Sequence, residues 1–105
     1  MHTVKVKICG ITNLEDAQVA VEMGADILGF NFYKKSPRYI EPKKAEDIIR
    51  QLPSFIETAG LFVDSTIEEI DGIASHRWMN WAQLHGDQSP EFCEELGTHN
   101  MKIMK

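Results

Sequence analysis

Four side chains with chemical potential stand at or beside the ends of apolar runs: Cys9, Asn31, Asp64 and His85. A thiol can act as a base once it loses its proton, but a free thiol has an ordinary pKa of about 8.5 and is only roughly 3% ionised at pH 7. A nearby ammonium favours the thiolate, and Lys7 precedes Cys9 by two residues. Taken alone, a cysteine that ends a strand is more often a small buried apolar residue.

Short apolar runs alternate with helical patterns, and this alternation predicts which elements carry those side chains. Between the runs, apolar residues recur every three or four positions, which is typical of helices with one buried face. Connections that hold a helix require parallel strands joined by right-handed crossovers. Strands are predicted at residues 4–9, 26–32, 57–63 and 81–85, and a fifth could open at 101–104.

The helix boundaries also have local signals. Thr12 and Glu15 fit a capping box, as do Ser65 and Glu68, so we expect helices to start there. Prolines suit the first turn of two further helices, and glycines in the left-handed conformation suit the ends of two. These prolines and glycines are Pro42, Pro90, Gly24 and Gly97.

Alternation along the strands separates a polar face from an apolar one. Lys5, Lys7 and Cys9 share one face of the first strand, and Gln83 and His85 share one face of the fourth. Open doubly wound sheets are covered by helices on both faces, whereas a barrel can hold polar groups inside, near its catalytic end. The polar face therefore favours a barrel. An antiparallel-like edge whose lysines simply face water is the alternative.

The composition is that of a soluble globular domain. The 105 residues (12.0 kDa) are 43% hydrophobic and 26% charged, with a net charge of −5, which disfavours broad nucleic-acid binding. No apolar run reaches the roughly 18 residues that a membrane span needs, and the first residues do not form a secretory signal. Two cysteines are too few for a disulfide framework. We expect a cytoplasmic protein that binds neither nucleic acid nor membrane.

Four motifs, in order along nearly the whole chain, resemble the phosphoribosylanthranilate isomerases of tryptophan biosynthesis. The sequence departs from the family pattern at Lys34, where proline is frequent, and at Gln88, where an acid is usual. Neither position is one to which we assign chemistry. The motifs are KICGIT at 7–12, GFNFY at 29–33 leading into SPRYI at 36–40, GLFVD at 60–64 and QLHGD at 83–87.

The resemblance implies a (β/α)8 (TIM) barrel and an aldose-ketose isomerisation. The reaction would be the Amadori rearrangement of N-(5-phosphoribosyl)anthranilate, without metal or organic cofactor. Cys9 matches the family's general base, and Arg38 matches its substrate-binding arginine, which can hold the anthranilate carboxylate through two parallel hydrogen bonds. Gln83 and His85 would line the same mouth, with Lys7 beside the thiol.

A barrel of this class needs at least about 200 residues, and the chain has 105. We therefore expect residues 1–105 to be the amino-terminal (βα)4 half of one barrel domain, without the downstream half. The resemblance implies that the general acid, an aspartate, and the phosphate site lie in that absent half. The exposed strand edges predict that the chain belongs to a longer protein, binds a complementary half or dimerises, and that alone it is inactive.

Two other functions stay open at this point. One is a non-catalytic half-barrel that acts in assembly, and the other is a different sugar-phosphate barrel enzyme such as an epimerase or synthase. A metal site is not predicted, because the remaining candidate ligands lack metal-ligand spacing. Those candidates are His2, His76, His99 and Cys93.

Overall fold

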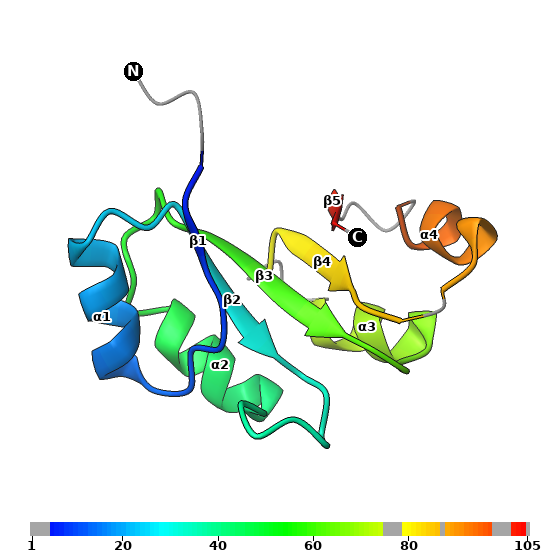
Figure 1. Ribbon diagram of the computed structural model, residues 1–105, viewed down its shortest axis with the longest axis horizontal. Coiled ribbons are helices and arrows are strands. Elements are labelled where there is room, and N and C mark those ends of the chain that lie inside the picture. Colours follow the sequence, from blue (N-terminus) through cyan, green and yellow to red (C-terminus); the bar gives the residue numbers. More distant parts are fainter. Residues whose placement is uncertain (1–4, 75–78, 87, 98–101, 105) are drawn as a thin grey trace.

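A parallel sheet with helices between its strands makes up the protein (Figure 1). The structure is a computed structural model and describes residues 5–74, 79–86, 88–97 and 102–104. The strands are β1 (Lys7–Ile8), β2 (Ile27–Asn31), β3 (Glu57–Phe62), β4 (Trp81–Leu84) and β5 (Lys102–Met104). The helices are α1 (Leu14–Glu22), α2 (Pro42–Ile49), α3 (Ile67–Ala74) and α4 (Pro90–Gly97).

The strand order in the sheet is β1-β2-β3-β4-β5, and every neighbouring pair is parallel. A sheet built in chain order with crossovers of one hand places its helices on one face, whereas a doubly wound sheet reverses direction to cover both. Figure 1 shows α1 and α2 beside β1 and β2, with α3 and α4 toward β4 and β5. The parallel α/β fold is confirmed, and the antiparallel-like edge is wrong.

The core lies between the sheet and the helices. Alternate strand residues such as Phe30 and Phe62 are almost fully buried, and the ring centre of Phe62 lies 5.5 Å from that of Phe32. Helix residues Ala17, Ala45 and Ile70 join the same apolar cluster at 0% exposure. The opposite face of the sheet, defined by Gly29, Asn31, Ala59, Leu61, Gln83 and His85, is called the helix-free face below.

The start of α1 differs from the prediction by one residue. Asn13, not Thr12, is the N-cap, and its Oδ1 accepts a hydrogen bond from the Asp16 amide at 2.7 Å. Both residues can cap a helix, and asparagine is the stronger N-cap of the two, so the observed cap agrees with the local preference. Ala17 and Ala20 of this helix are buried in the core.

The same one-residue shift occurs at α3. A complete capping box forms from Thr66 and Glu69: the Glu69 amide donates to Thr66 Oγ1 at 3.1 Å, and the Thr66 amide donates to Glu69 Oε1 at 2.8 Å. The predicted pair, Ser65 and Glu68, is therefore wrong. The hydrogen bonds from Thr66 lower the pKa of the Glu69 carboxyl, and Lys34 lowers it further.

The other helix signals have mixed outcomes. Pro42 and Pro90 are the first residues of α2 and α4, as predicted, and the Ser89 side chain accepts from the first turn of α4. Gly24 follows α1 with a φ of 95°, which confirms its left-handed role. α4 ends at Gly97, as predicted, but Gly97 does not have a positive φ, so the predicted left-handed conformation is wrong. None of the helices in the described residues is long and apolar enough to cross a membrane.

Candidate active site

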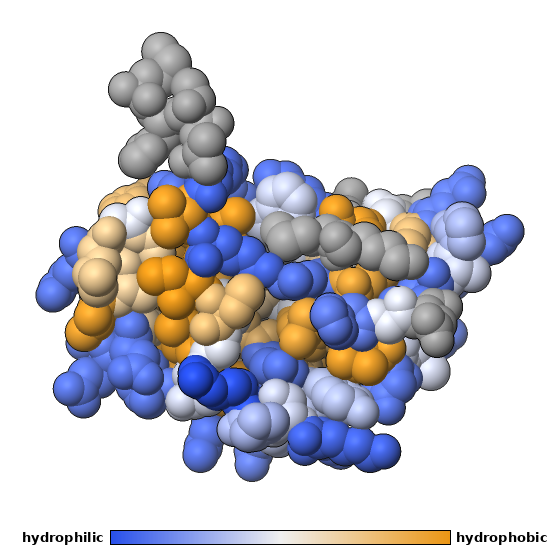
Figure 2. All heavy atoms as spheres, viewed as in Figure 1, coloured by the Kyte–Doolittle hydropathy of each residue, from blue (hydrophilic) through white to orange (hydrophobic). Residues whose placement is uncertain are grey.

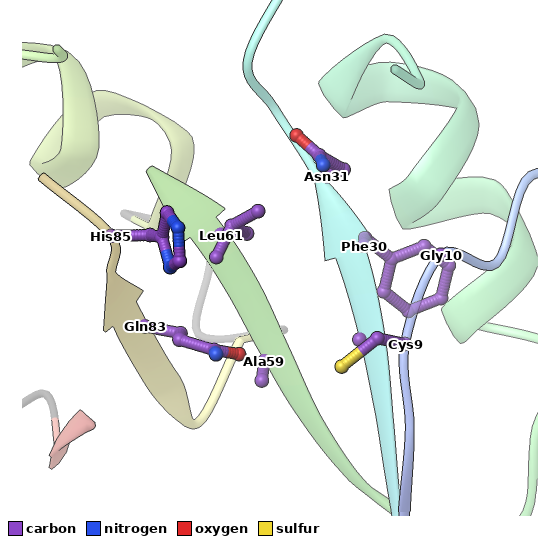
Figure 3. A pocket seen from close by; sticks show the side chains of 9 residues that line it. Cys9, Gly10, Phe30, Asn31, Ala59, Leu61, Gln83 and His85 are labelled. Carbon is purple, nitrogen blue, oxygen red and sulfur yellow. The ribbon is translucent and has the colours of Figure 1, made fainter. Parts of the chain in front are cut away.

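A cavity of about 200 Å³ opens on the helix-free face, toward the carboxyl-terminal ends of the strands (Figure 3). Four consecutive parallel strands end at one edge of the sheet, so residues that are far apart in sequence meet there. Strand alternation explains which of them point inward, since most of the lining residues are odd-numbered. The lining residues are Cys9, Gly10, Gly29, Phe30, Asn31, Ala59, Leu61, Gln83 and His85.

Cys9 directly follows β1, and its side chain is exposed in this cavity. Figure 3 shows its sulfur pointing across the cavity toward the strand that carries Gln83. The neighbouring strand leaves room because it has glycine at position 29, where an added Cβ would lie 3.3 Å from Cys9 Sγ. Cys9 is therefore not the buried apolar residue that its sequence position alone would suggest.

Lys7 and Gln83 contact each other across the helix-free face. The Lys7 ammonium donates a hydrogen bond to Gln83 Oε1, which joins β1 to β4. Gln83 lines the Cys9 cavity, and Lys7 lies two residues before Cys9 along the chain. The two predicted site residues are thus brought together, and the lysine does not simply face water.

Arg38 lies at the rim of the cavity and not within its lining. Its side chain is exposed, its Nη1 lies 3.5 Å from the Gly10 carbonyl oxygen, and it lines a neighbouring groove together with Cys9. Its backbone amide donates to Ser36 Oγ at 3.1 Å, which helps to hold the loop after β2 in place. Arg38 and Cys9 thus share a groove beside the cavity, and the predicted role of Arg38 in binding substrate stays a prediction.

His85 lies opposite Cys9, just after β4. Its imidazole is exposed and lines the cavity, while its amide donates to the Phe62 carbonyl at 2.9 Å. The next residue, Gly86, is constrained, because a Cβ there would lie 2.6 Å from the Val63 carbonyl oxygen. This close approach of two loops fixes the backbone from which His85 projects.

Asn31 is a residue of this site that the sequence analysis noticed only by its position. Its Nδ2 donates to Ser36 Oγ at 3.1 Å, and its Oδ1 accepts from the Tyr33 amide at 2.9 Å. It therefore connects the cavity to the loop that carries Arg38. Two signals could have identified Asn31: it alternates onto the same face of β2 as Gly29, and it stands at the carboxyl-terminal end of the strand.

Other candidate residues lie elsewhere. Asp64 lines a separate groove beside α3 with Lys34 and Lys35, and Asp87 lies outside the described residues. Cys93 is half-buried on α4 and packs against the core. Within residues 5–74, 79–86, 88–97 and 102–104, no three His, Cys, Asp or Glu side chains are grouped as metal ligands. Chemistry without a metal or cofactor stays a prediction.

Comparison with known proteins identifies the family of this site. The sequence profile described as N-(5'phosphoribosyl)anthranilate (PRA) isomerase matches residues 6–105. The chain belongs to the phosphoribosylanthranilate isomerase family. The resemblance found in the four sequence motifs is thus confirmed, and the family's place in tryptophan biosynthesis with it.

Individual family members are similar over nearly the whole chain. The isomerase of Thermotoga neapolitana is 55% identical over 101 residues, which are 96% of this chain and 48% of that protein; the isomerase of Geobacter sp. (strain M21) is 52% identical over the same shares. The crystal structure of the Thermotoga maritima isomerase superposes with a TM-score of 0.91 at 46% identity, over 96% of this chain and 49% of that one.

A phosphoribosylanthranilate isomerase solved in complex with reduced 1-(o-carboxyphenylamino)-1-deoxyribulose 5-phosphate has the same TM-score of 0.91 and the same 46% identity. It is matched over 96% of this chain and 52% of its own. The chain therefore spans about half the length of the family members that it matches.

Proposed function

We propose that this chain contributes the general base and the carboxylate-binding group to a phosphoribosylanthranilate isomerase. The substrate would be N-(5-phosphoribosyl)anthranilate, and the product 1-(2-carboxyphenylamino)-1-deoxyribulose 5-phosphate. The observation that carries the proposal is the Cys9 sulfur exposed in a cavity at the carboxyl-terminal strand ends, where barrel enzymes hold their active sites. Family membership and the neighbour solved with a compound of this chemistry support it.

The proposed reaction needs one acid and one base. The acid protonates the ring oxygen of the ribose, and the C1–O bond breaks to give an iminium between C1 and the anthranilate nitrogen. The Cys9 thiolate then removes the proton from C2, and the electrons of that C–H bond form the C1–C2 double bond of an enolamine. The C1–N π electrons return to nitrogen in that step. The C2 hydroxyl of the enolamine then loses its proton as C1 gains one, which gives the ketone. General base catalysis of this kind contributes about 10² to 10⁴ in rate.

The other predicted residues receive supporting roles in this proposal. Arg38, at the rim, would bind the anthranilate carboxylate through its two terminal nitrogens. His85 and Gln83, opposite Cys9, would hydrogen-bond to the sugar hydroxyls. Lys7 would keep the Gln83 amide oriented by occupying its oxygen, so that the amide nitrogen is the end presented to the substrate.

We further propose that residues 1–105 form half of one (β/α)8 barrel. The chain-order parallel sheet, with its uncovered face carrying the site, supports this, as does the half-length match to the family. The general acid and phosphate site would then come from a complementary polypeptide, and the chain alone would be inactive. A cytoplasmic location is part of the proposal and agrees with the two unpaired cysteines.

The unpaired side of β1 supports association through the sheet edges. Val6, Val19 and Met23 are 46%, 48% and 78% exposed, and Figure 2 shows apolar side chains gathered over β1 and α1. A strand edge bordered by apolar groups is suited to pairing with another chain. Either a complementary half or a second copy would use this edge.

A turnover assay tests the proposal. The chain is assayed alone and after refolding with a polypeptide that covers the second half of the Thermotoga neapolitana isomerase. Activity only in the mixture supports the isomerase assignment, and activity in neither sample favours the non-catalytic half-barrel. If the mixture is active and Cys9→Ala retains full activity, another sugar-phosphate enzyme is favoured. Sedimentation of the chain as a stable monomer would contradict self-association.

A further inference from the structure

Glu57 begins β3 on the helix-free face, at the end of the sheet opposite Cys9, and its carboxylate contacts side chains from three other strands. Its Oε1 accepts a hydrogen bond from Lys5 Nζ, just before β1, at 2.5 Å. Its Oε2 accepts from Trp81 Nε1 of β4 at 3.0 Å and lies 3.5 Å from Lys102 Nζ of β5. Lys102 Nζ also lies 5.1 Å from the centre of the Trp81 ring, a cation–π distance.

The position of Glu57 in the strand order gives this cluster its significance. β3 is the middle strand, whereas Lys102 belongs to the edge strand β5 and Lys5 lies two residues before the other edge strand, β1. Neighbouring strands lie about 4.8 Å apart, so each edge is about 10 Å from β3, a distance that a lysine and a glutamate side chain can bridge together. The strand between β1 and β3 places Ile27 beside Glu57, so no charge from β2 competes.

We infer that Glu57 is a positioning residue that docks both edge strands of the sheet through one carboxylate. Lys5 and Cys9 lie on the same extended segment, so whatever docks β1 also holds the backbone of Cys9. The Lys7–Gln83 hydrogen bond makes a second connection, between β1 and β4, and Lys7 is two residues nearer to Cys9 than Lys5 is. This inference concerns the strands and does not depend on the proposed reaction.

The environment of Glu57 distinguishes this cluster from an ordinary surface ion pair. An isolated exposed pair contributes little, because both side chains lose freedom and water screens them. The Glu57 side chain is 22% exposed and accepts two hydrogen bonds, one of them from the uncharged Trp81 indole, while the more exposed Lys102 adds a second positive charge at 3.5 Å. The hydrogen bond from Lys5 lowers the pKa of the Glu57 carboxyl the most, and Trp81 and Lys102 lower it further, so the carboxylate is the form that the fold favours.

Hydrogen exchange, resolved by peptide, tests the inference on the full chain at pH 7. Glu57→Gln removes the charge and keeps the size of the side chain. The amides of β1 through Ile11, and those of β5, should exchange about tenfold faster, the change expected from the loss of one charged hydrogen bond. The amides of β2 and the centre of β3 should keep their protection. Glu46→Gln is the matched control, because its partner Arg50, 3.1 Å away, is the residue that directly follows the same helix.

Single-edge variants make the test independent of whether Glu57→Gln folds. Lys5→Met should accelerate exchange at β1 alone, and Lys102→Met at β5 alone, while Lys5→Arg should restore the protection of β1. The emission of Trp81 in a Trp78→Phe background should change in Glu57→Gln and not in Glu46→Gln. Equal acceleration in all strands, or unchanged exchange at both edges, would overturn the inference.

Discussion

The two ends of the helix-free face have opposite chemistry, although they are built from the same strands. At the amino-terminal end, Glu57 binds partners from both sheet edges, so its charge is used within the protein. At the carboxyl-terminal end, Cys9 and His85 are exposed around a cavity of about 200 Å³. The comparison teaches that polar groups whose partners are other strands organise the sheet, whereas polar groups that face a cavity are available to a ligand.

The largest expected effect is at the cavity end. Cys9→Ala should lower the turnover of the enzyme reconstituted with a complementary half by about 10² to 10⁴, because the base is lost. Cys93→Ala is the control, since Cys93 is half-buried on α4, away from the cavity. Equal loss in the two variants would mean that Cys9 has no special role.

Arg38→Lys should raise the KM of the same reconstituted enzyme by about tenfold or more, because an ammonium cannot reproduce two parallel hydrogen bonds to a carboxylate. Its kcat should change less. Arg50→Lys, directly after α2, is the control. An unchanged KM in Arg38→Lys would show that Arg38 at the rim does not bind the carboxylate.

Alanine substitutions of two glycines compare the space beside Gly60, on the helix-covered face of the sheet, with the space beside Gly72 on α3. Gly60→Ala should cost about 1–3 kcal/mol of unfolding free energy, because a Cβ there would lie 2.3 Å from Met79 Sδ and 2.8 Å from Phe32 Cε2. At Gly72, within α3, the described residues beyond the helix's own backbone place no atom within 4 Å of a new Cβ, so Gly72→Ala should be neutral or stabilising. Urea unfolding measures both, and similar midpoints would contradict the packing of this face.

A smaller effect is expected at Lys7, which lies between the Glu57 end and the Cys9 end of the helix-free face. Lys7→Met removes the hydrogen bond to Gln83 and the positive charge nearest to Cys9 along β1. The KM of the reconstituted enzyme should rise severalfold, because the Gln83 side chain loses the hydrogen bond that orients it. Steady-state kinetics measure this, with Lys43→Met on the exposed side of α2 as the control. An unchanged KM would show that Lys7 does not orient Gln83 for the substrate.

The smallest effect concerns pH. Folding lowers the pKa of Glu57 below the ordinary value of 4.5, so its contribution to stability is complete above that value and is lost as the pH falls through the lowered pKa. The unfolding free energy of the protein should therefore fall more steeply in this acid range than that of Glu57→Gln. Parallel urea titrations at pH 7 and in mild acid check this, and identical losses would show that the carboxylate does not contribute.

Most of the fold could be predicted from the sequence, for identifiable reasons. Apolar runs and intervening helical periods predicted all five strands within a few residues, because burial on one face imposes a repeat that sequence displays. The prediction failed at Asn13 and Thr66, where an adjacent residue could cap as well, and at Gly97. In these places more than one adjacent residue type can end or begin a helix, so the local signals did not fix the exact position or conformation.

The sequence by itself determined which residue types could do chemistry, and on which face of each strand they stand. It placed Cys9, Gln83 and His85 on one face through a repeat of two, a property of the backbone that needs no tertiary contact. Only the tertiary structure decided that Lys7 would bond to Gln83, that Arg38 would lie at the rim, and that Glu57 would hold both sheet edges. These pairings join residues 28 to 76 positions apart, and their geometry depends on how the strands are ordered and how closely they approach.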